Sequence, residues 1–70
     1  MTLSEIIRYT METTNTTARI CAAELGISPQ NFGQRLRRDG FDLEETRVIL
    51  DACGAHLEMC VVVGDTRFNV

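Results

Sequence analysis

The segment 28–38 contains six amide or guanidinium side chains and no carboxylate: Gln30, Asn31, Gln34, Arg35, Arg37 and Arg38. In a helix, with about 100° per residue, all six lie on one arc of about 160°. Asparagine and glutamine can pair bidentately with adenine, arginine with guanine, and all three can bind phosphate. A face that served only solubility would normally mix charges of both signs. The pattern therefore favours binding to a DNA major groove over a merely solvated surface.

The charge of the chain is divided unevenly along its length. The formal net charge is −3, which argues against indiscriminate binding to nucleic acid. Residues 1–38 contain five arginines and three acidic residues, whereas residues 39–70 contain two arginines and seven acidic residues. We expect base contacts from Gln30, Asn31, Gln34 and Arg35. We expect phosphate contacts from Arg19, Arg37, Arg38 and the helix N-terminus at Ser28.

Local signals predict four helices, at about residues 3–13, 17–25, 28–38 and 42–53. Thr2 and Glu5 have the spacing of a capping box, and so do Asp42 and Glu45. Gly26 supplies a left-handed residue that ends the second helix, and Ser28 caps the third. The third helix contains Gly33 in its interior, which costs roughly 1 kcal/mol relative to alanine.

The residues after the fourth helix change period and predict a β-hairpin. Residues 56–63 alternate and then become β-branched, Gly64-Asp65 forms a turn, and residues 66–70 return as a second strand. An isolated hairpin is marginal in water, and an exposed strand edge invites pairing. We therefore expect the hairpin to pack on the helices and to pair with its copy in a second subunit. The alternative is a monomer in which the hairpin only covers the core. The expected dimer interface comprises Leu57, Met59, Val61, Val63 and Phe68.

The composition predicts one soluble domain, residues 1–70, with 44% hydrophobic and 24% charged residues. No apolar run approaches the roughly 20 residues of a membrane span, and the N-terminus lacks signal-peptide features, so we expect a cytoplasmic protein. The cysteines Cys21, Cys53 and Cys60 form no C-x-x-C pair, and His56 is the only histidine. We therefore expect no metal, no cofactor and no catalytic site; the chain is not expected to be an enzyme.

Between the second and third helices the chain reads Ala22-Ala23-Glu24-Leu25-Gly26-Ile27-Ser28, after Thr17 and before an apolar residue at Phe32. In this pattern it resembles the lambda repressor/Cro-like (XRE-type) helix-turn-helix family, and the likeness extends over about residues 3–54. The resemblance implies a mainly α fold, a four-helix bundle with helix 28–38 as the recognition helix. The chain departs from the family at Ala18, often a glutamine, at Cys21, commonly a leucine, and in the hairpin that replaces a fifth helix.

The resemblance also implies a dimeric transcriptional regulator, a repressor that binds a palindromic operator in double-stranded DNA, with half-sites about 34 Å apart. The alternative is a protein-interaction module on the same fold, such as an antitoxin or a phage-encoded inhibitor of a host defence system. The acidic net charge is compatible with this alternative, and a repressor can also bind a protein partner.

Overall fold

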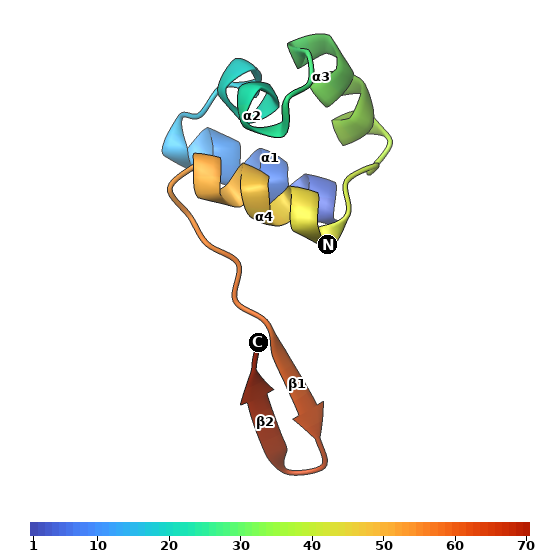
Figure 1. The fold of residues 1–70 in the computed structure, drawn as a ribbon, viewed down its shortest axis with the longest axis vertical. Coiled ribbons are helices and arrows are strands. Elements are labelled where there is room, and N and C mark those ends of the chain that lie inside the picture. Colours follow the sequence, from blue (N-terminus) through green and yellow to red (C-terminus); the bar gives the residue numbers. More distant parts are fainter.

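The computed structural model describes residues 1–70 and contains four helices followed by a two-stranded antiparallel hairpin (Figure 1). The elements are α1 (Leu3–Thr14), α2 (Ala18–Leu25), α3 (Pro29–Arg37), α4 (Leu43–Ala52), β1 (Cys60–Val63) and β2 (Thr66–Asn69). The mainly helical fold predicted from the sequence is confirmed, and the helices agree with the predicted ranges to within one residue at each end. No helix combines the length and the apolarity needed to cross a membrane.

The side chains that the sequence marks as caps set where each helix begins. Thr2 and Glu5 form a complete capping box at α1, and Asp42 and Glu45 form another at α4. Thr17 and Ser28 cap α2 and α3 by accepting hydrogen bonds from the backbone N–H groups of Ile20 and Asn31. Each hydroxyl or carboxylate satisfies a backbone donor that has no partner within its helix.

The core lies where the four helices meet. It contains Ile7 from α1, Cys21 and Ala22 from α2, Phe32 and Leu36 from α3, Phe41 before α4, and Ile49 and Cys53 from α4 and its end. The rings of Phe32 and Phe41 are 5.2 Å apart between centroids and tilted by 39°. This packing fixes α3 from its inner side and leaves its outer side free.

The hairpin does not pack on the helices, and that part of the sequence prediction is wrong. Both strands are exposed along their whole length, and Figure 1 shows them extending away from the helical bundle. The hairpin and α3 lie toward opposite ends of the longest axis, which measures 44 Å against 22 and 21 Å for the others. Core side chains from all four helices already pack against one another, and none comes from the hairpin.

The first strand is also shorter than predicted, because it starts at Cys60 rather than at residue 56. The register pairs Cys60 with Asn69, and the backbone N–H of Val70 donates to the carbonyl of Met59. Residues 56–58 have no opposing residue in this register. The turn is at Gly64-Asp65 as predicted, with Gly64 at φ +58°.

The register gives the hairpin one face on which Thr66 is the only polar residue. Directly opposed residues share a face, as do alternate residues along a strand. Val61 pairs with Phe68, Val63 pairs with Thr66, and Met59 lies across from Val70. We call this the apolar face of the hairpin, comprising Met59, Val61, Val63, Phe68 and Val70. Val61, Val63, Phe68 and Val70 are at least half exposed to solvent.

Candidate nucleic-acid interface

A tight turn fixes the orientation of α3 relative to α2. Gly26 ends α2 at φ +72°, and the N–H of Ile27 donates to the carbonyl of Ala22 at 3.0 Å. The Ser28 hydroxyl then accepts the N–H of Asn31 at 3.0 Å, and Pro29 occupies the first turn of α3. A glycine is required at Gly26 because side chains disfavour a positive φ. The turn therefore places α3 directly after α2, with α3's N-terminus in solvent.

The outer side of α3 is a continuous polar surface. Four exposed residues of α3 and its C-cap residue Arg38 form what we call the polar face of α3: Gln30, Asn31, Gln34, Arg37 and Arg38. The opposite side is buried, with Phe32 fully inaccessible and Leu36 at 9% exposure. The five side chains carry only amide and guanidinium groups, so every one of them donates hydrogen bonds.

The C-terminal half of this face is hollowed. Gln34, Arg37 and Arg38 line a shallow depression of about 230 Å³. The guanidinium of Arg37 turns back along the helix, and its Nη1 lies 3.7 Å from where a Cβ on Gly33 would stand. All three of these side chains carry hydrogen-bond donors, which favours an acceptor-rich group such as a phosphate oxygen or a base edge.

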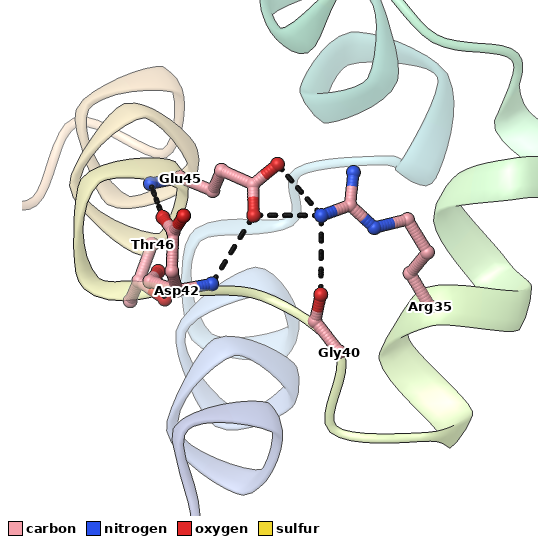
Figure 2. Close-up of polar contacts among 5 residues, drawn as sticks. All are labelled: Arg35, Gly40, Asp42, Glu45 and Thr46. Carbon is pink, nitrogen blue, oxygen red and sulfur yellow. Dashed lines mark hydrogen bonds and ion pairs between the residues drawn. The ribbon is translucent and has the colours of Figure 1, made fainter.

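Arg35, which the sequence assigned to base contacts, points away from the polar face of α3. Figure 2 shows its guanidinium directed toward the start of α4, where Nη2 lies 2.6 Å from each carboxylate oxygen of Glu45. The same nitrogen donates to the carbonyl of Gly40 at 3.1 Å, and Cζ lies 4.7 Å from the centroid of Phe41. The side chain is only 23% exposed. In this conformation Arg35 does not face the same side as the other predicted base contacts, because its Nη2 is engaged with Glu45 and Gly40.

Glu45 connects this contact to the helix cap. Its carboxylate accepts from Arg35 and also from the backbone N–H of Asp42, the reciprocal half of the capping box. The hydrogen bond from Arg35, and then the one from Asp42, hold the pKa of the Glu45 carboxyl below its usual value. The carboxylate thus stays ionised at neutral pH, and the contact that orients α3 persists.

The four helix N-termini fall into two electrostatic classes. The first turns of α1 and α4 contain acidic residues, which neutralise the positive end of the helix dipole. The first turns of α2 and α3 contain none, and Arg19 stands exposed in the first turn of α2. The two helices on either side of the tight turn therefore keep positive ends in solvent, where an anion is stabilised.

The structure adds one cation that sequence reasoning missed. Arg8 of α1 is exposed, makes no ion pair, and lines an open groove of about 480 Å³ that is also lined by the acidic Glu12 and by Leu36 of α3. Its position next to α3 depends on how α1 crosses the bundle. A single arginine on the outer side of an amphipathic helix gives no signal of this in the sequence.

The remaining polar groups do not form a second site. No cluster of three or more potential metal ligands is present. Cys21 and Cys53 are buried in the core, and burial, followed by the proximity of Cys53, raises the pKa of Cys21 to about 12. A thiol with that pKa is not a nucleophile at neutral pH. The polar face of α3 is therefore the candidate site.

Comparison of the chain with protein-family models, with curated proteins and with solved structures finds no match. The case for a function therefore depends on the geometry and charge of the chain itself.

Proposed function

We propose that this chain is a cytoplasmic, dimeric transcriptional regulator that binds double-stranded DNA sequence-specifically, with the fold of the lambda repressor/Cro-like helix-turn-helix family. In this proposal α3 enters the major groove, and the chain represses transcription from a palindromic operator. Gln30, Asn31 and Gln34 contact base edges. Arg19, Arg37, Arg38 and the capped N-terminus at Ser28 contact phosphates.

One observation carries the proposal: the exposed face of α3 consists of amide and guanidinium groups without a carboxylate. This face follows α2 through a three-residue turn, and both helices present unneutralised N-termini to solvent. The arrangement supplies phosphate-binding groups beside base-reading groups, which is the combination that a specific DNA-binding helix needs. The acidic second half of the chain limits non-specific binding.

The apolar face of the hairpin supplies the dimer contact in this proposal. Four of its five side chains are at least half exposed, and an exposed apolar patch of this kind is typical of an interaction surface. Leu57 and Met59 are half-buried and lead into it, so the predicted interface residues are continuous with Val61, Val63 and Phe68. A two-fold axis through paired hairpins gives the inverted-repeat symmetry that an operator of this kind has.

Selection from random duplex DNA tests the binding. At low salt we expect the protein to enrich an inverted repeat whose half-sites are centred about 10 base pairs apart. Gln34→Ala is then expected to weaken binding to the selected operator more than to random DNA, whereas Arg38→Ala weakens both about equally. Arg47→Ala on α4 is the control and leaves both unchanged. Failure to enrich any sequence at low salt overturns the proposal.

Sedimentation equilibrium tests the dimer. Val61→Asp places a charge on the apolar face of the hairpin and is expected to yield a monomer. Because the hairpin stands apart from the helices, the helical circular dichroism stays unchanged. Asn69→Asp, on the opposite face of the hairpin, is the matched control and remains dimeric. A wild-type monomer at micromolar concentration rules out this interface.

A protein partner is the second candidate, and the apolar face of the hairpin is the observation that favours it. Such a partner would fit an antitoxin or a phage-encoded inhibitor of a host defence system. Two results together support this candidate. A tagged wild-type chain co-purifies with a stoichiometric protein partner that Val61→Asp does not retain, and the wild-type chain is not retained on DNA at low salt.

A further inference from the structure

Gly33 is the one glycine in the chain that lies inside a helix, and nothing in the free protein requires it there. Three others have positive φ, namely Gly26, Gly54 and Gly64. Gly40 lies in the turn between α3 and α4, where a Cβ would stand 3.4 Å from the carbonyl oxygen of Arg35. Gly33 has ordinary helical geometry, and a Cβ there would meet only Arg37 Nη1 at an ordinary 3.7 Å. Yet it lies in the middle of α3, where glycine is one of the least favourable residues.

The position of Gly33 on α3 indicates which group could occupy the space that a side chain would otherwise fill. Gly33 and Arg35 precede and follow Gln34, so they lie about 100° to either side of the centre of the polar face of α3. They are therefore the two flanks of that face. One flank has no side chain at all. On the other, Glu45 and Phe41 hold the Arg35 side chain against α4.

The dimensions of a DNA duplex explain why narrow flanks on α3 would favour binding. An α-helix with its side chains is about 10–12 Å across, and the major groove is about 12 Å wide. Side chains at the centre of an inserted helix meet the bases, whereas those on the flanks meet the sugar–phosphate walls. A helix can therefore enter the major groove deeply only where the side chains on its flanks are small or are held away from the groove.

We infer that Gly33 is the point where the backbone of α3 comes closest to a DNA strand, so that a sugar–phosphate unit lies in the notch between Gln30 and Arg37. The Arg37 guanidinium, which overhangs this notch, contacts the phosphate. Gly33 thus determines the depth of insertion, and with it the reach of Gln30 and Gln34 to the base edges. This inference rests on the proposed function and specifies how the same face meets its ligand.

Substitution at Gly33 separates stability from binding. Gly33→Ala removes the penalty for glycine and meets no obstacle, so we expect the melting temperature to rise by about 4–8 °C. Binding to the selected operator is expected to weaken by about tenfold or more, as for the loss of one base contact. Gly33→Gln, with a longer side chain, weakens it further. Thr13→Ala on the exposed side of α1 is the control: it raises helix propensity without filling the notch, and leaves binding unchanged.

The outcomes are distinguishable. A Gly33→Ala variant that is more stable and binds the operator as well as wild type overturns the close approach and leaves the proposed function intact. A wild-type protein without preference for any duplex sequence overturns both. Weakened operator binding in a variant whose melting temperature has risen supports the inference, because a folding defect cannot produce that combination.

Discussion

Replacement of Arg38 by glutamine should change the salt dependence of DNA binding by a predictable amount. The logarithm of the affinity for a duplex falls with the logarithm of the salt concentration, with a slope of about −0.9 for each phosphate neutralised. Arg19, Arg37 and Arg38 are the proposed phosphate contacts, and each is exposed and makes no ion pair, which gives six phosphate-contacting cations in a dimer. The expected wild-type slope is therefore about −5.4, and that of Arg38→Gln about −3.6.

These slopes correspond to a large difference in DNA affinity between two ordinary salt concentrations. Between about 50 and 200 mM salt, the wild-type affinity is expected to fall about 2,000-fold and that of Arg38→Gln about 150-fold. Fluorescence anisotropy with a labelled operator duplex, titrated at four or more salt concentrations, measures both slopes. The slope is informative because it reports phosphate contacts separately from base contacts.

The paired arginine provides the matched control. Glu45 neutralises Arg35, so the double variant Arg35→Gln/Glu45→Gln removes no net charge and should keep the wild-type slope. Circular dichroism first verifies that each variant is folded. An unchanged slope in Arg38→Gln, or an equal decrease in the double variant, would refute the division of the arginines into free and paired groups.

Three further predictions concern the fold that orients α3. Arg35 lowers the folded-state pKa of Glu45, so this stabilisation is present at neutral pH and is lost as the pH falls through that pKa, below the usual value of 4.5. Urea unfolding should find Glu45→Gln less stable than wild type at pH 7, with the difference shrinking as the pH falls below the usual 4.5 of a glutamate; a difference that stays constant as the pH falls contradicts this role. In the native protein a thiol reagent should modify only Cys60 rapidly, because Cys21 and Cys53 are buried. After unfolding it should modify all three cysteines. Rapid modification of two or more thiols in the native protein would show that the core is open. Ile49→Val, in a fully buried position, should lower the free energy of unfolding by about 0.5–1.5 kcal/mol, whereas Val62→Ala on the exposed hairpin leaves the melting of the helices unchanged.

The elements were predictable because their signals are local. Capping boxes, the Gly26 stop and the Ser28-Pro29 start each involve residues within four positions of one another, and the structure shows every one of these caps. The exposure of the polar face of α3 follows from the same periodicity, since Phe32 and Leu36 fix which side is buried.

The orientation of Arg35 and the placement of the hairpin differ from expectation because they depend on contacts between distant parts of the chain. Arg35 lies at the edge of the polar arc, and whether it faces DNA or α4 depends on Glu45, ten residues later and across a turn. The hairpin's apolar side chains predict a partner but do not identify it. Burial within the same chain was the simplest choice, yet the four helices already supply the core side chains.

The free and paired charges separate the two halves of the chain more sharply than the net charges do. Three of the seven arginines make contacts within the protein: Arg35 with Glu45, Arg47 with Glu44, and Arg67 with the Cys60 sulfur. The four with neither an ion pair nor a side-chain hydrogen bond within the protein, Arg8, Arg19, Arg37 and Arg38, all lie between residues 1 and 38. A phosphate beside α3 therefore meets uncompensated arginines from α1, α2, α3 and the C-cap of α3, although the whole chain is acidic. An acidic protein with this distribution of arginines can bind DNA specifically, because binding then requires the surface that contains those arginines to face the duplex.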